Sequence, residues 1–215
     1  MLVSRSGRHG LTLAELLVVL CILGVLACLV LPVVSMVLRA ARNAACLNNL
    51  RQIGTCAMVY AADHNGALPA EGNKGIEDAS RSPAWFARLP PIAEQRSVKD
   101  PMTVFQCPLF RWQGPRVFSN ATPKSYKMNA YLDEPNRPIH YRVGMGTFET
   151  ETVYFIDAVA GETGMGQWGH CPYSAVDDTR HGGQSVNILY LDGHTGSRKR
   201  RTGEAWKDLL RWKPW

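Results

Sequence analysis

The sequence predicts an α+β protein, in which a long N-terminal helix leads into a small head with a short antiparallel sheet. Three observations support this prediction. An apolar run occupies residues 11–31, a helical pattern continues over 32–62, and short strand-like segments separated by turns fill 63–215. The 19 glycines and 13 prolines among 215 residues favour a loop-rich head over a helical bundle.

The apolar run at residues 11–31 has 21 residues and one charged side chain, that of Glu15. At about 1.5 Å per residue it forms about 31 Å of helix, which matches the hydrocarbon thickness of a bilayer. Apolar side chains surround the whole helix axis, whereas a helix of a soluble protein carries a polar stripe. We therefore expect a transmembrane helix over 11–31.

Glu15 is an ionisable residue inside this span. Such a residue costs about 2.5–3.5 kcal/mol at the bilayer centre and less near an end, so it favours a functional role with a partner. The alternative is that Glu15 reaches the membrane surface and is simply solvated.

A short basic leader ends at Gly10, and the sequence LTLAE follows at residues 11–15. This arrangement resembles the processing site of type IV prepilins and type II secretion pseudopilins, in which a glutamate is the fifth residue after the cut. The resemblance implies that a prepilin peptidase cuts after Gly10 and methylates the new amino group of Leu11. It also implies that Glu15 pairs with the N-terminal ammonium of a subunit during assembly, because unpaired charges in lipid are costly.

Pro32 stands where these proteins commonly have a helix-bending proline. Its missing N–H and its clash with the preceding turn explain such a bend. The chain departs from the usual family pattern by having Leu11 in place of phenylalanine and Ala14 in place of isoleucine or valine. Gly10 and Glu15 are both in place, so the resemblance still implies processing.

The resemblance also implies a location and partners. Residues 1–10 would be a cytoplasmic leader, the helix a single pass through the bacterial inner membrane, and the head periplasmic or part of an extracellular filament. The partners would be prepilin peptidase, the inner membrane and other pilin-like subunits, by self-assembly. The alternative is that the chain is a lipoprotein with a lipid attached to Cys28. However, the apolar run continues past that residue, where the sequence of a lipoprotein would become polar.

An amphipathic helix is predicted over 32–62, because apolar residues recur at three- and four-residue steps and Asp63-His64-Asn65-Gly66 supplies a stop. The sequence CLNNLRQIG at 46–54, with the later NGxLP pattern at 65–69, is similar to a subgroup of pilin-like proteins found in planctomycete and verrucomicrobial genomes. That similarity marks a family without specifying a function.

The head is expected to contain short helices at 83–89 and 204–212 and several strands. The strand candidates combine β-branched or aromatic residues with flanking turn residues, and they cover 104–107, 126–131, 152–157, 185–191 and 194–198. The last two flank Asp192-Gly193, a dipeptide typical of a two-residue hairpin turn.

His181 with Asp192 and Gly193 resembles a His-then-Asp-Gly signature of the same subgroup, with ten intervening residues where nine are usual. Its physical content would be a hairpin turn and a histidine bonded at its start. A metal site of His181, Asp192 and His194 is the sharper alternative. Their spacing is not that of zinc ligands, and the adjacent aspartates at 177–178 do not make a calcium loop, so we expect no metal and no cofactor.

Four cysteines outside the span would face an oxidising compartment if the head is exported, namely Cys46, Cys56, Cys107 and Cys171. The sequence FQCP at 105–108 resembles the second cysteine motif of the subgroup. The resemblance therefore implies a Cys46–Cys107 disulfide, which leaves Cys56 with Cys171 as the remaining pair. Four cysteines allow three pairings, and the spacing alone does not choose among them.

No enzyme is expected, because the sequence lacks a nucleophile elbow, a Walker loop, a His-Glu-x-x-His pair and a dinucleotide fingerprint. The net charge of +6 is concentrated at the two ends, with seven basic and two acidic residues in 196–215. Tryptophans in this tail could stack on bases, but aromatics at helical spacing are more often core, so nucleic acid is not expected as a partner.

These observations together predict a structural subunit of a type II secretion pseudopilus or of a type IV pilus-like filament. The alternative is a membrane-anchored periplasmic module that binds DNA or carbohydrate and does not polymerise.

Overall fold

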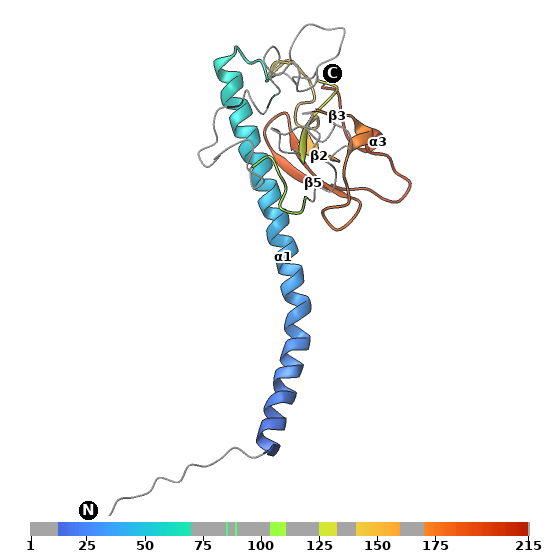
Figure 1. Cartoon of the computed structure of the whole chain (residues 1–215). Coiled ribbons are helices and arrows are strands. Elements are labelled where there is room, and N and C mark those ends of the chain that lie inside the picture. Colours follow the sequence, from blue (N-terminus) through green and yellow to red (C-terminus); the bar gives the residue numbers. More distant parts are fainter. Residues whose placement is uncertain are drawn as a thin grey trace, which may run out of the picture. The chain divides into compact units, whose positions relative to one another are not determined.

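The structure is a computed structural model that describes residues 13–69, 85, 89, 104–110, 125–132, 141–159 and 170–214 (Figure 1). The chain divides into two units, Met1–Ala41 and Arg42–Trp215. The predicted α+β class, with one long apolar N-terminal helix and a small head built on a mainly antiparallel sheet, is confirmed.

Helix α1 (Leu13–Asp63) has 51 residues and passes from the first unit into the second. Every residue from 13 to 42 is exposed, and the helix is long and apolar enough to cross a membrane. These properties are compatible with a single-pass membrane anchor. The helix ends at the predicted stop, where Asn65 adopts a φ of 53° and the Gly66 N–H donates to the Ala61 carbonyl at 2.7 Å.

The head contains five strands in the order β3-β1-β2-β4-β5. Strands β1, β2, β4 and β5 pair antiparallel in series, and β3 pairs parallel with β1. The bounds are β1 (Tyr126–Asn129), β2 (Val153–Asp157), β3 (His170–Cys171), β4 (Ser185–Tyr190) and β5 (Thr195–Lys199). The 3-10 helix η3 (Tyr173–Ala175) follows β3, and helix α3 (Trp206–Leu209) follows β5.

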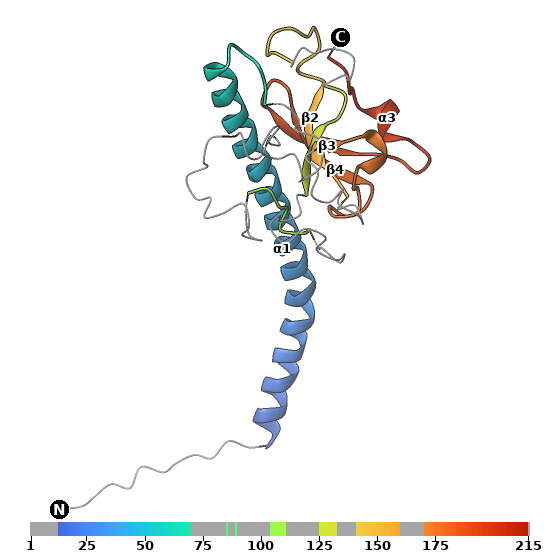
Figure 2. The ribbon, with the colours of Figure 1, turned by 45° about the horizontal axis from the view of Figure 1, so that its top comes forward.

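The head contains two hydrophobic clusters. In Figure 2 the strands lie between the C-terminal half of α1 and α3. One contains Leu50, Ile53 and Ala57 of α1, together with Trp85, Phe155 and Leu189. The other lies on the α3 side and contains Ile156, Val186, Ile188, Trp206 and Trp212. Alternate residues of β4 thus enter different clusters, as the two-residue period of a strand requires.

Two predicted elements are wrong in kind or length. Residues 104–107 form a turn instead of a strand, because the Phe105 carbonyl accepts from the Ser125 N–H and the Cys107 N–H donates to the Ser125 hydroxyl. The C-terminal helix spans only Trp206–Leu209, because Leu210 is already extended and Arg211 forms a parallel bridge with Thr152. Of the predicted helix at 83–89 the structure describes only Trp85 and Leu89, which share a helical hydrogen bond of 3.1 Å.

Candidate functional site

The N-terminal candidates are only partly described. Gly10 and Leu11 lie outside the described residues. Glu15 lies in the first turn of α1 and is exposed. A negative charge there is favoured by the helix dipole, whose positive end lies at the N-terminus.

Helix α1 includes Pro32 within its length, and the Ser35 hydroxyl donates to the Pro32 carbonyl at 2.8 Å. The helical assignment continues through both residues to Asp63. The bend expected at Pro32 stays a prediction.

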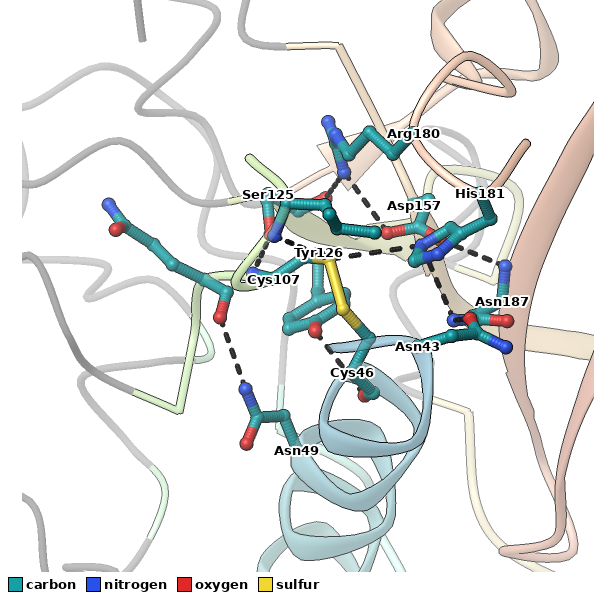
Figure 3. Close-up of a disulfide and its surroundings, with 12 residues drawn as sticks. Asn43, Cys46, Asn49, Cys107, Ser125, Tyr126, Asp157, Arg180, His181 and Asn187 are labelled. Atoms are coloured by element: carbon teal, nitrogen blue, oxygen red, sulfur yellow. Dashed lines mark hydrogen bonds and ion pairs between the residues drawn. A yellow bond between two sulfur atoms is a disulfide. The ribbon is translucent and has the colours of Figure 1, made fainter. Parts of the chain in front are cut away.

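A disulfide joins Cys46 of α1 to Cys107 across 61 residues of sequence (Figure 3). Its surroundings hold the two segments together by hydrogen bonds. The Asn49 amide donates to the Gln106 carbonyl at 3.1 Å, and the Tyr126 hydroxyl donates to the Cys46 carbonyl at 3.3 Å. Closing a loop of this length stabilises a fold by about 4 kcal/mol in the chain-entropy model.

A buried ion pair lies beside the disulfide. The carboxylate of Asp157, at the end of β2, is fully buried, and the side chain of Arg180 is 5% exposed. Arg180 Nη1 donates to Asp157 Oδ1 at 3.0 Å and to the Ser125 carbonyl at 3.1 Å, and Nη2 donates to the Ala158 carbonyl. Nη2 also meets Asp177 at 2.8 Å. The guanidinium is therefore well satisfied, as a buried charge must be.

His181 completes this group. Its Nε2 lies 3.0 Å from Asp157 Oδ2 and 3.8 Å from the Sγ of Cys107, and the side chain is 3% exposed. We call Cys46, Cys107, Asp157, Arg180 and His181 the polar cluster. Figure 3 shows its members converging from α1, β2 and the segments before β1 and β4.

Asn187 ties the polar cluster to the helix. Its backbone N–H donates to Asp157 Oδ2 at 2.8 Å, and its side-chain amide donates to the side-chain oxygen Oδ1 of Asn43 at 2.7 Å. The Ser197 hydroxyl of β5 donates to the Asn187 side-chain oxygen. A polar side chain in the middle of β4 is thus fully used to connect three elements.

The residues of the predicted His-then-Asp-Gly signature lie in two separate parts of the structure. His181 lies in the polar cluster, whereas Asp192 and Gly193 form the turn of the β4–β5 hairpin. The Gly193 N–H donates to the Tyr190 carbonyl at 3.0 Å, and the Tyr190 N–H donates to the His194 carbonyl at 2.9 Å. The turn therefore has three residues where two were predicted, and Gly193 takes the left-handed position with a φ of 90°.

The metal site considered for His181, Asp192 and His194 is not assembled. Asp192 Oδ1 lies 2.6 Å from His194 Nδ1 in the hairpin, and neither residue contributes to the polar cluster. Asp177, considered above as a calcium ligand, already contacts Arg180 and Thr179. Burial opposes ionisation of Asp177, but Arg180 and hydrogen bonds from Thr179 outweigh it, so the pKa of this carboxyl is lowered.

The second predicted disulfide is wrong, because Cys56 and Cys171 are both free thiols. Cys171 lies in β3 and is fully buried, whereas Cys56 lies partly exposed on α1. Burial raises the pKa of the Cys171 thiol to about 12, with smaller opposing effects of Lys127 and Arg180. A thiol held in its protonated form is a poor nucleophile.

The comparisons with known proteins identify the family. Residues 39–165, more than half of the chain, match the model of a family described as a protein of unknown function (DUF1559). The chain belongs to the DUF1559 family. This is a family of pilin-like bacterial proteins. No curated protein and no solved structure matches the chain.

The DUF1559 match covers part of the polar cluster. Cys46, Cys107 and Asp157 lie within residues 39–165, whereas Arg180 and His181 follow them. Sequence analysis missed the roles of Asp157, Arg180 and Asn187. The available signal was an acidic residue that ends the otherwise apolar strand VYFID, since a buried carboxylate needs a cationic or hydrogen-bonding partner.

Proposed function

We propose that the chain is a structural subunit of a pseudopilus or type IV pilus-like filament, and that it has no catalytic role. The observation that carries this proposal is the continuity of α1. An exposed apolar helix with Glu15 in its first turn leads without interruption into the head of a DUF1559 protein. An exposed apolar surface of this length needs lipid or other helices around it.

In this proposal prepilin peptidase cuts after Gly10, methylates Leu11 and leaves α1 in the inner membrane with the head in the periplasm. Neighbouring α1 helices then pack together in the filament. The carboxylate of Glu15 neutralises the N-terminal ammonium of another subunit, because an unpaired charge among apolar helices is unfavourable. The support for this step is the exposed position of Glu15 at the start of the helix and the Gly10–Glu15 spacing.

The mass of the protein extracted from membranes tests the processing step. A chain that begins at methylated Leu11 supports the proposal. A chain that retains residues 1–10, or one lipidated at Cys28, contradicts it.

Substitution of Glu15 tests the assembly step. We expect Glu15→Gln to be processed normally but to enter sheared filaments at least about tenfold less than the parent chain, since charge pairing in an apolar setting is worth several kcal/mol. Leu17→Ala, a change of an exposed apolar residue in the same part of α1, is the matched control. Normal incorporation of Glu15→Gln would remove its proposed role. Processed parent chain that never enters filaments would instead favour a membrane-anchored binding module.

A further inference from the structure

Strand β5 lies at one edge of the sheet, where β4 is its neighbour on the inner side. In an antiparallel pair, alternate residues of a strand turn their N–H and C=O groups toward the partner strand. The Arg200 N–H donates to the Gln184 carbonyl at 2.8 Å, so the even-numbered residues of this segment are those that bond to β4. The backbone groups of Thr195, Ser197 and Lys199 therefore point away from the sheet.

These outward groups form a free strand edge. The N–H and C=O groups of Thr195, Ser197 and Lys199 have no hydrogen-bond partner among the described residues. The second half of the strand, from Ser197 to Lys199, is exposed. An open edge of this kind is a template for one more strand. Extended peptide segments bind other proteins in this way, and main-chain hydrogen bonds supply the affinity.

The same edge carries positive charge on both faces of the sheet. Arg198 and Lys199 are adjacent in the strand, so their side chains point to opposite faces. Neither side chain forms an ion pair with a carboxylate among the described residues. The next basic residue, Arg200, differs from them because it is paired with Asp178. Two positive charges without a counter-charge in the described part of the head thus lie beside the free backbone groups.

We propose that β5 binds an acidic extended segment of another protein, which adds to the sheet as an antiparallel strand. Two adjacent carboxylates of that segment lie opposite Arg198 and Lys199, one on each face of the sheet. Its main chain exchanges hydrogen bonds with Thr195, Ser197 and Lys199. A second copy of β5 is a poor occupant, because it brings like charges to one edge, and lysines on edge strands oppose such self-pairing.

This binding concerns the head alone, because β5 lies in the unit Arg42–Trp215. It does not require α1 to enter a filament, so its test is separate from the tests of processing and assembly. The hydrogen bonds and the charges make different demands on the partner, and a different change tests each of them.

A synthetic peptide tests the addition of a strand. The probe is fluorescein-TEEVTVT-amide, whose two glutamates lie opposite Lys199 and Arg198 in an antiparallel pairing. It is titrated with the full chain in detergent and followed by fluorescence anisotropy. N-methylation of the second, fourth or sixth peptide residue removes an N–H that donates to β5, and each change should weaken binding by at least about tenfold. N-methylation of the third or fifth residue, whose N–H points away from β5, should change binding by less than about twofold.

Two pairs of variants test the same contacts on the head. Ser197→Pro removes an outward N–H and keeps the bonds to β4, so we expect it to weaken binding by at least about tenfold. Ser197→Ala is its matched control, because it keeps the N–H. Lys199→Glu should also weaken binding, whereas Lys207→Glu, a change of an exposed lysine in α3, should not.

Several results would contradict the proposal. If Ser197→Pro does not fold, the alternation in the N-methyl series decides. Equal losses at all five N-methylated positions would mean that charge alone holds the peptide, which overturns the addition of a strand. Equal binding of a peptide with lysines in place of both glutamates would overturn the acidic partner. No binding of the glutamate peptide, or dimers of the parent chain that Ser197→Pro abolishes, would overturn the proposal as a whole.

Discussion

Asp157 is the residue on which the buried polar contacts of the head depend. Its two oxygens contact Arg180, His181 and the Asn187 N–H, and its side chain is fully buried. We expect Asp157→Asn to lower the free energy of unfolding of the oxidised chain by about 3–5 kcal/mol, because it leaves the Arg180 guanidinium buried without its main counter-charge.

Urea unfolding followed by tryptophan fluorescence measures this loss. Asp192→Asn, a change in the exposed hairpin turn, is the control and should cost less than about 1 kcal/mol. A loss below that level for Asp157→Asn would mean that Asp177 and the backbone carbonyls satisfy Arg180 by themselves.

Lys127 is a buried lysine on β1 with 1% of its surface exposed. Burial lowers its pKa to about 8, Cys171 opposes this shift and Arg180 adds to it. Between pH about 8 and about 10.4 the unfolded chain holds a proton that the folded chain has lost, so the contribution of Lys127 to stability rises with pH in that window. Below pH 8 the charged amine destabilises the fold by about 3 kcal/mol.

The pH dependence of Lys127→Met tests this assignment. The variant should be more stable than the parent chain at pH 7, and its advantage should shrink as the pH rises from 8 to 10. Cys171 acts in the opposite sense in both chains, because its raised pKa makes stability fall above pH 9.0, so the test is read from pH 8 to 9. Lys199→Met, which removes an exposed lysine from β5, controls for the loss of a lysine. An advantage that does not vary with pH would contradict the low pKa.

At the scale of elements, the packing of α1 on the sheet depends on Gly54. A Cβ at this position would lie 2.8 Å from Leu189 Cδ1, and Leu189 is fully buried in β4. We expect Gly54→Val to destabilise the head by about 1–3 kcal/mol through overpacking, although valine is a better helix former than glycine.

Gly24→Val is the matched control, because a Cβ at Gly24 meets nothing within 4 Å. Both variants would be compared by thermal unfolding with near-ultraviolet circular dichroism. Equal unfolding temperatures for the two variants would mean that the Leu189 side chain can move aside without lowering the stability of the head.

The sequence predicts those helices and strands whose pattern lies within a short stretch of the chain. The course of α1 follows from its apolar periodicity and its Asn65-Gly66 stop. Strands β1, β2 and β4 follow from mainly apolar segments between turns, and the polar strand β5 follows from the Asp192-Gly193 turn before it. The two-residue strand β3 has too few residues to produce a pattern. Phe105 and Arg211 were misassigned because their backbone partners, Ser125 and Thr152, lie far away in sequence.

The candidate site was less predictable for the same reason. His181 and Asp192 seemed to form one signature because they are close in sequence, yet the first joins Asp157 and the second joins His194. The Cys46–Cys107 pair was implied by resemblance, and no spacing rule could separate it from the other pairings. The Arg180–Asp157 contact requires two segments 23 residues apart to meet inside the core, which a linear pattern does not encode.

At the scale of the whole molecule, the two units differ in how much of their apolar surface is buried. Residues 13–42 bury nothing, whereas the buried positions of α1 begin at Cys46 and end at Ala61. We therefore expect a chain of residues 42–215 to fold as a soluble protein with the Cys46–Cys107 disulfide. We expect a chain of residues 58–215 not to fold.

The expected failure follows from magnitudes. The shorter chain loses Leu50 and Ile53, each worth about 1.5–3 kcal/mol of burial, and the disulfide, worth about 4 kcal/mol. These losses are comparable to the total stability of a domain, which is about 5–15 kcal/mol. Gel filtration and near-ultraviolet circular dichroism would compare the two chains. A folded 58–215 chain would show that the C-terminal half of α1 is an appendage of the head and not part of its core.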